Sequence, residues 1–323
     1  MIRFLAALAI ALPTLAMAEE PPKSWTWAWP DTDFSKSSVP FAEIFSGGPP
    51  KDGIPAITGP TMKPVSEETV LAPREPVVVL EMAGEIPRAY PIRYLTWHEI
   101  VNDRVGATPV AVTFCPLCNS AVTFDTRVGD RELEFGVSGK LRNSDMIMYD
   151  RQTESWWQQF IGTGVVGEMT GAKLTVLPSW LEDWKSYSER HPDGLVMAQP
   201  TGHRRDYGRN PYANYDRSDW PFLYRGEEPP HNIHPLARVV AVGDRAWPLE
   251  RLSNVREISE DGVRLTWRPG QASAMGAANI ADGLEVGNVR TFDSQTGAAI
   301  PHDVAFAFAF HAFYPEGAWM LGD

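Results

Sequence analysis

Short apolar runs separated by turn residues account for most of the chain. The runs at 77–82, 109–114 and 121–125 are rich in Val, Phe and Thr, which favour extended backbone. Gly129-Asp130 is a hairpin signal ahead of the next run, at 132–137. Further runs of this kind lie at 86–92, 145–149, 238–242, 263–267 and 304–310. The pattern therefore predicts many short strands joined mainly by tight antiparallel connections.

Helical patterns are few and short. Residues 94–103 are the best candidate, with Thr96 as N-cap, and 180–191 predict a second helix that Pro192 ends. The 28 prolines and 26 glycines of the chain also disfavour long helices. We expect a β-rich fold of mainly antiparallel strands with a few short peripheral helices, and an α+β arrangement is the alternative.

The first eighteen residues have the pattern of a secretory signal peptide (1–18). Arg3 supplies the positive charge, residues 4–12 form the apolar run, and Ala16-Met17-Ala18 is a small-residue cleavage site. No later apolar run approaches the ~18 residues that a membrane-spanning helix needs. We therefore expect an exported protein, periplasmic or secreted, with no transmembrane segment in the mature chain.

Residues 19–64 are rich in Pro, Trp, Ser and Gly, and predict an irregular but ordered N-terminal arm. Trp25, Trp27 and Trp29 alternate within it. Such alternation would place the three rings on one face of a strand that packs against the body, and a sugar-stacking platform is the alternative. The remaining residues, 65–323, are expected to form the β-rich domain.

Composition narrows the functional classes. The chain has 323 residues, of which 43% are hydrophobic and 22% charged, and these values are typical of a globular protein rather than a disordered one. Its 29 Lys and Arg residues against 41 Asp and Glu residues give a net charge of −12. Because nucleic-acid binding needs a cationic face, no nucleic acid is expected among the partners.

The most informative feature is the pair of cysteines, Cys115 and Cys118, between two apolar strand-like runs. A thioredoxin-type pair would open a long helix, whereas the residues after Cys118 predict a strand. A metal-binding knuckle instead lies at a hairpin tip, and Asn119 is suited to the left-handed backbone that often follows its second cysteine. A disulfide across so short a loop would contribute little stability. Metal binding is therefore favoured over a redox-active dithiol or a plain disulfide.

A metal site needs further ligands besides the two thiolates. His98 lies shortly before the apolar run at 109–114, so a short connection could bring it back beside the knuckle. Met146 and Met148 alternate in the run at 145–149 and point to one face. An imidazole with a thioether such as that of Met148 would favour copper, and an imidazole with a carboxylate would favour zinc. We expect a transition-metal site formed by Cys115, Cys118, His98 and Met148, with copper or zinc as the ion.

Polar residues near these candidates predict a second shell or a pocket. Arg142 is suited to an anion and Asp150 to acid–base work, although hydrogen-bonded hairpin turns would also account for this polar stretch. The predicted second-shell or pocket residues are Glu99, Asp103, Arg142, Asn143, Ser144 and Asp150.

Two other functional classes remain open from the residues alone. One is a thiol–disulfide oxidoreductase with Cys115 as nucleophile, although the missing helix removes the usual source of thiolate stabilisation. The other is an envelope binding module without catalysis, in which exposed Trp and Tyr loops recognise a glycan or a peptide. No catalytic residue and no particular partner is predicted, so the sequence does not assign an enzymatic reaction.

The motifs together resemble a bacterial and archaeal family called domain of unknown function 3179. The resemblance runs from about residue 50 to near the C-terminus. It rests on the segments Asp52-Gly53-Ile54-Pro55-Ala56, Arg88-Ala89-Tyr90-Pro91, Trp97-His98-Glu99-Ile100-Val101-Asn102-Asp103, Thr113-Phe114-Cys115-Pro116-Leu117-Cys118, Phe135-Gly136-Val137-Ser138-Gly139, Met148-Tyr149-Asp150-Arg151-Gln152-Thr153 and Tyr207-Gly208-Arg209-Asn210-Pro211-Tyr212. The resemblance implies no activity, but it implies that the His and Cys segments are family motifs, which supports a shared His/Cys site.

Overall fold

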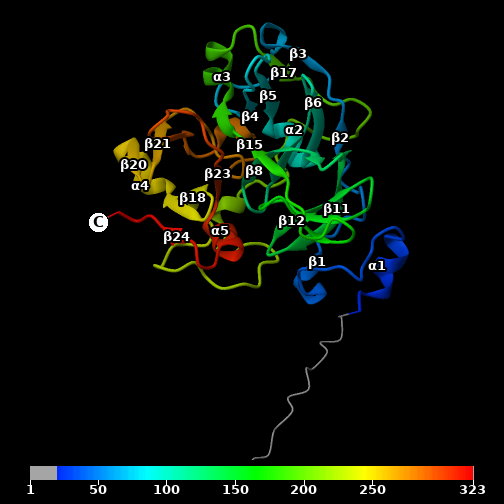
Figure 1. Cartoon of the computed structure of the whole chain (residues 1–323). Helices are drawn as coiled ribbons and strands as arrows, with labels where there is room; N and C mark the ends of the chain where they lie inside the picture. The colour runs from blue at the N-terminus through cyan, green and yellow to red at the C-terminus, as the bar shows by residue number, and fades with distance from the viewer. Residues whose placement is uncertain (1–19, 323) are drawn as a thin grey trace, which may run out of the picture.

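The computed structural model describes residues 20–322, so the predicted signal peptide lies outside the described residues. Antiparallel strands dominate and the helices are few and short, which confirms the expected fold class. Small sheets are arranged in a five-bladed, propeller-like ring, which Figure 1 shows from one side. Among the described helices, none is long and apolar enough to cross a membrane.

Two of the sheets carry the candidate site. Sheet I has the order β15-β8-β7-β6-β2, and sheet II the order β1-β11-β12-β13-β14. The strands of sheet I are β2 (Ile57–Thr58), β6 (Ile100–Val105), β7 (Thr108–Cys115), β8 (Ser120–Asp125) and β15 (Thr175–Leu177). Those of sheet II are β1 (Ile44–Ser46), β11 (Phe135–Arg142), β12 (Asp145–Asp150), β13 (Trp156–Gln158) and β14 (Thr163–Val166). The two sheets meet where β11 contacts β6.

Three further sheets complete the ring. Sheet III contains β3 (Met62–Pro64), β4 (Pro76–Leu80), β5 (Arg88–Pro91), β16 (Ser179–Asp183) and β17 (Leu195–Met197). Sheet IV contains β18 (Arg238–Val242), β19 (Arg245–Pro248), β23 (Asp303–Phe306) and β24 (Ala318–Trp319), and sheet V contains β20 (Glu257–Glu260), β21 (Val263–Arg268) and β22 (Asn288–Asp293). A small ribbon of β9 (Arg127–Val128) and β10 (Arg131–Glu132) extends from sheet I. Contacts of β8 with β23 and of β16 with β22 hold neighbouring sheets together.

Short helices connect the sheets. They are α1 (Lys23–Ala28), α2 (Ile92–His98), α3 (Trp184–Arg190), α4 (Leu249–Val255) and α5 (Ala307–Phe313), with single 3₁₀ turns η1 (Phe41–Glu43), η2 (Val65–Glu67), η3 (Tyr215–Arg217) and η4 (Ile280–Asp282). The largest hydrophobic core includes both cysteines together with residues of β4, β7, β12 and α5. The cysteines therefore lie inside the molecule and not on its rim.

Both predicted helices are shorter than expected. The helix expected over 94–103 ends at His98, because Glu99 takes a positive φ of 60° and the apolar residues after it pair with β7 as β6. The helix expected over 180–191 begins only at Trp184, where the Asp183 side chain caps it by accepting from the Ser186 N–H. Its first part is β16, which pairs with β4. In each case cross-strand pairing of apolar residues outweighs a helical pattern.

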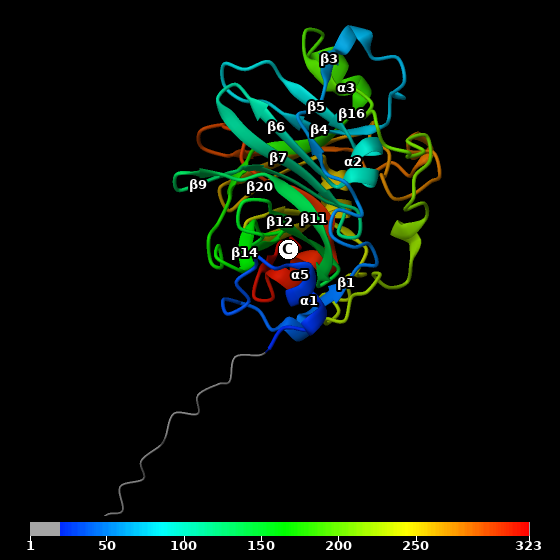
Figure 2. The ribbon, with the colours of Figure 1, turned by 90° about the vertical axis from the view of Figure 1, so that its right-hand side faces the viewer.

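The N-terminal arm packs on sheet II, and Figure 2 shows α1 beside β1 below that sheet. Its tryptophans form a helix and not the expected strand. Trp25 lies in α1, and Trp29 caps its C-terminus by donating its N–H to Trp25 O; both are buried, whereas Trp27 is 87% exposed. Residues 44–64 supply β1, β2 and β3 to three different sheets, so this part of the arm is built into the ring.

A bulge shapes the strand that faces the cysteines. The register of β11 against β12 shifts between Val137 and Lys140. Gly139 lies in this bulge with a φ of 73°, and a Cβ there would approach the carbonyl oxygen of Pro49 to 2.0 Å. Glycine is therefore required at this position, both for its backbone conformation and for the close approach of the arm.

Candidate metal centre

The cysteines lie at the tip of the β7–β8 hairpin, as the sequence predicts. Cys115 ends β7 and pairs in register with Ser120, the first residue of β8. The turn between them contains the bonds Cys118 N–H to Cys115 O, 3.2 Å, and Asn119 N–H to Pro116 O, 3.2 Å. Asn119 has the predicted left-handed backbone, with a φ of 51°. The segment is a knuckle and not the start of a helix.

Strand β23 of sheet IV holds this knuckle from the other side. The Asn119 side chain donates to Val304 O at 2.6 Å, and the Phe306 N–H donates to Cys118 O at 2.9 Å. The Ala121 N–H donates to the Asp303 carboxylate at 2.9 Å. The hairpin tip is thereby fixed between two sheets, and such fixed placement is what a metal site requires of its ligands.

A second hairpin, β11–β12, brings a carboxylate to the sulfurs. Asn143 and Ser144 form its turn, with φ values of 52° and 62°. The Ser144 carbonyl oxygen lies 3.9 Å from the Cys115 sulfur and 3.6 Å from the Cys118 sulfur. Asp145 follows directly, and one ligand atom each of Cys115, Cys118 and Asp145 lies within 4.8 Å of the other two. All three residues are buried, and this cluster could hold a metal ion.

The Asp145 carboxylate has partners both outside the cluster and within it. Its Oδ2 accepts from Gln158 Nε2 at 2.7 Å and from the Phe160 N–H at 3.0 Å. Its Oδ1 is buried with no partner outside the cluster among the described residues, and the Cys115 and Cys118 thiols lie within hydrogen-bonding reach of the carboxylate. The carboxylate is therefore oriented through Oδ2 and leaves Oδ1 available for an ion.

Burial shifts the pKa values of all the acids around the cluster upwards. It raises the pKa of Asp145 to about 6, and it raises the pKa of the Cys115 thiol and, more strongly, that of the Cys118 thiol. Burial, followed by the nearby charge of Asp145, raises the pKa of Glu99 to about 8. The main influences on these four groups come from burial, from one another and, for Asp145, from the hydrogen bonds of Gln158 and Phe160, and none comes from a basic side chain. Without a cation the site must hold protons.

The thiols are unsuited to redox catalysis in this state. Both cysteines are free, and they are only 0–1% exposed. A reactive cysteine is a partly exposed thiolate in electropositive surroundings, whereas these thiols are buried beside acids and their pKa values are raised. The arrangement does not support the oxidoreductase hypothesis.

His98 is not part of the cluster, and this differs from the expected ligand set. Both of its ring nitrogens have other partners: Nδ1 lies 2.6 Å from Pro55 O and Nε2 lies 2.7 Å from the Tyr207 hydroxyl. Burial lowers the pKa of His98 to about 4, so the ring is neutral. It joins α2 to the arm and to the loop that carries Tyr207, which is a structural role.

Met148 also lies away from the cluster's carboxylate. It is fully buried in the main core and pairs in register with Val137 and Trp157. Because side chains alternate along a strand, Met148 and Asp145 are on opposite faces of β12. Met148 lies in the same main core as both cysteines, so its role as a ligand stays a prediction, and the strand also adds an acid to the cluster.

The other expected pocket residues divide into two groups. Ser144 and Asn143 form the turn at the cluster. Glu99 lies near the cluster, since the charge of Asp145 contributes to the raised pKa of Glu99. The remaining three have structural partners elsewhere: Asp103 accepts from Arg88 and Tyr90, Arg142 pairs with Glu43, and Asp150 accepts from Thr153 and Trp157. The polar stretch therefore contributes one loop to the site, and its other members stabilise hairpins.

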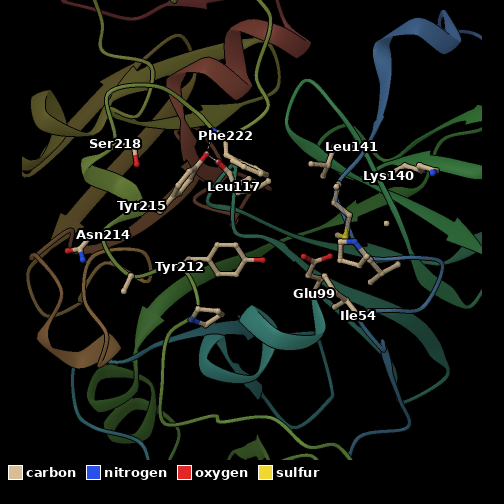
Figure 3. Close-up of a pocket in the computed structure, with 17 residues that line it drawn as sticks. Ile54, Glu99, Leu117, Lys140, Leu141, Tyr212, Asn214, Tyr215, Ser218 and Phe222 are labelled. Carbon is tan, nitrogen blue, oxygen red and sulfur yellow. Dashed lines mark hydrogen bonds between the residues drawn. The ribbon is translucent and has the colours of Figure 1, made fainter.

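A cavity of about 470 Å³ adjoins the cluster. Its wall includes Leu117, which stands between the two cysteines in the sequence, and Met146, the residue after Asp145 in the sequence. Figure 3 shows the Glu99 carboxylate and the Tyr212 hydroxyl pointing toward one another across it. Sequence reasoning missed both Asp145 and Tyr212. The position of Asp145 directly after the Asn143-Ser144 turn was the available signal, whereas Tyr212 belongs to the segment 207–212, which supports the family resemblance but suggested no site by its residue types.

Comparison with known proteins identifies a family but no activity. The family model described as protein of unknown function (DUF3179) matches residues 51–317, which confirms the resemblance found in the sequence. An alignment 138 residues long, which covers 39% of this chain and 14% of the other protein, shows 28% identity to the valine–tRNA ligase of Methanocaldococcus jannaschii. No solved structure matches the chain significantly. The similarity to the ligase spans too little of that protein to indicate a shared activity.

Proposed function

The chain belongs to the DUF3179 family, whose description names no activity, and from its site we propose that it is a zinc-binding protein in which Cys115, Cys118 and Asp145 hold the ion. The observation that carries the proposal is the gathering of these three buried acids, with Glu99 close by, and no basic group among their main electrostatic influences. Taking several acids out of water is costly unless a cation or protons neutralise them. A divalent ion would neutralise the cluster and use Asp145 Oδ1 as a ligand.

The donor atoms favour zinc over copper. Thiolate sulfur and carboxylate oxygen are both ordinary zinc ligands. Copper(I) prefers soft donors, and the carboxylate of Asp145 in the cluster is a hard one. Three protein ligands leave one position of a tetrahedral zinc site open, which is the arrangement that accepts water or another small ligand.

Export is part of the proposal. The signal pattern of residues 1–18 directs the chain out of the cytoplasm, to the periplasm or beyond. Thiols in such an oxidising space would pair unless they were protected. In this protein, burial and coordination of the ion protect the two thiolates from oxidation to a disulfide.

Metal uptake tests the proposal. Reduced, metal-free protein made without a His-tag should take up about one zinc ion per chain and release about two protons at neutral pH, since both thiols are protonated in the apoprotein. Metal analysis and a proton-release titration measure these values, with copper(I) as the competing ion. No uptake, or retention of copper in the presence of excess zinc, would reject the zinc assignment. Recovery of uncleaved chain from the cytoplasm would reject export.

A further inference from the structure

The cavity beside the metal centre contains two polar groups that the protein leaves unsatisfied. The Glu99 side chain is 8% exposed, and neither its carboxylate nor the Tyr212 hydroxyl has a hydrogen-bond partner among the described residues. Both groups line the cavity, and Figure 3 shows them facing each other. Tyr212 is only half-buried, so both groups reach the space inside the cavity. Because no protein group pairs with them, they are available to a ligand that enters the cavity.

The position of Glu99 is imposed by the backbone and is not a by-product of packing. It ends α2 with a positive φ of 60°, its N–H donates to Leu95 O at 2.7 Å, and its carbonyl accepts from the Phe114 N–H at 2.8 Å. A non-glycine residue in this conformation is strained, and such strain persists at functional sites because the surroundings enforce it. The helix end and the sheet edge together direct an acid into the cavity.

The charge balance of the cavity favours a cation. Glu99 and Lys140 are its two charged lining residues, and the Lys140 ammonium lies over the Trp25 ring, 5.5 Å from its centroid, directed away from the cavity in Figure 3. The interior thus keeps an acid without a basic partner, next to a metal centre of acidic ligands. Because burial raises the pKa of Glu99 to about 8, this acid is mostly protonated in the empty cavity at neutral pH. A cationic group would displace that proton and pair with the carboxylate, so cation binding should strengthen as the pH rises toward 8, whereas an anionic ligand would gain no such pair.

The remaining walls are apolar and aromatic. They include Ile54, Leu117 and Leu141 together with the rings of Tyr215 and Phe222. The Tyr215 hydroxyl is fixed by a 3.1 Å bond to Leu117 O and a 3.2 Å bond from the Phe222 N–H, so its ring is held as part of the wall. Aromatic walls attract organic cations as well as apolar groups. A volume of about 470 Å³ is in the range of small-molecule sites.

We propose that this cavity binds a small organic amine, whose ammonium group pairs with Glu99 and Tyr212 and whose apolar body packs against the aromatic wall. This site goes beyond zinc binding, because its ligand is recognised by residues outside the set Cys115, Cys118 and Asp145. Failure of amine binding and failure of zinc binding are therefore separate results.

Calorimetry with matched probes tests the amine site. Phenethylamine should bind the purified protein at least about 30-fold more tightly than 2-phenylethanol, which has the same apolar body without the charge. The alcohol cannot form the charge pair that the ammonium group makes with the Glu99 carboxylate. 3-Phenylpropionate should not bind. The Glu99→Gln variant should reduce the preference for the amine to about threefold or less, and Tyr212→Phe should weaken amine binding about fivefold through loss of one hydrogen bond.

The control variant is Glu67→Gln, an exposed acid in η2 that should bind phenethylamine like the native chain. Equal binding of the amine and the alcohol by the native chain would overturn the proposal, since the site would then be merely apolar. Unchanged amine binding by Glu99→Gln would also overturn it. Loss of zinc together with the amine in Glu99→Gln would place Glu99 in the metal centre and would equally reject an independent amine site.

Discussion

The Asp145→Asn variant is expected to bind zinc at least about 100-fold more weakly than the native chain, while the metal-free protein keeps its stability. Loss of a group that only orients a ligand costs 10–100-fold in metal affinity, so loss of a ligand should cost more. The apoprotein is spared because the Asn oxygen can still accept the bonds from Gln158 and Phe160. The substitution also removes an acid whose pKa burial raises to about 6. Cys115→Ser should lose zinc in the same way.

A matched control lies on the same strand. Asp150 is also a fully buried carboxylate of β12, but it accepts from the Thr153 backbone and hydroxyl and from Trp157 Nε1 at 2.8 Å. Asp150→Asn should therefore bind zinc normally and lose about 1–3 kcal/mol of unfolding free energy, because its amide group faces donors. Zinc competition and denaturant unfolding of both apoproteins measure the two quantities. Equal zinc affinity of Asp145→Asn and the native chain would remove Asp145 from the site.

Trp156→Ala should lower the free energy of unfolding by about 3–5 kcal/mol and release the N-terminal arm. The Trp156 ring is completely buried and is the common contact of the arm's aromatic residues, at centroid distances of 5.0 Å to Trp25, 5.3 Å to Trp29 and 5.4 Å to Phe34. Removing it leaves a cavity and takes away the surface on which the arm packs.

Trp27→Ala provides the comparison for this effect, because Trp27 is in the same arm and is 87% exposed. It should change the stability by less than about 0.5 kcal/mol. Denaturant unfolding measures both variants, and limited proteolysis should cut the arm of Trp156→Ala well before that of Trp27→Ala. Similar stability losses in the two variants, or an arm of Trp156→Ala that resists protease like the native one, would contradict this account of the arm.

The strands around the cysteines could be predicted because their chemistry is local. β7, the turn and β8 follow one another directly in the sequence. Asn is one of the few residue types that readily adopts a left-handed backbone, so the conformation of Asn119 could be predicted from its identity. The helices were less predictable. The run after His98 has a helical pattern, and only its pairing with β7 makes it a strand. Tertiary pairing of this kind is not visible in a window of sequence.

The candidate cluster was only half predictable for a related reason. The two cysteines are three residues apart, and their spacing alone indicates a shared site. Asp145 reaches them from a different sheet, through the Asn143-Ser144 turn, so its position depends on how two hairpins meet. His98 was expected there because it is close in sequence, but Pro55 and Tyr207, from distant segments, hold its ring. Proximity in sequence was a poor guide to the third member of the cluster.

X-ray absorption at the zinc edge of the zinc-loaded native protein tests the central claim most directly. The site described here predicts two sulfur neighbours at about 2.3 Å and oxygen neighbours at about 2.0–2.2 Å, with no scattering from an imidazole ring. It also predicts that the two sulfur neighbours remain in the Asp150→Asn protein. A first shell without sulfur, or one that contains a histidine ring, would contradict a centre built from Cys115, Cys118 and Asp145.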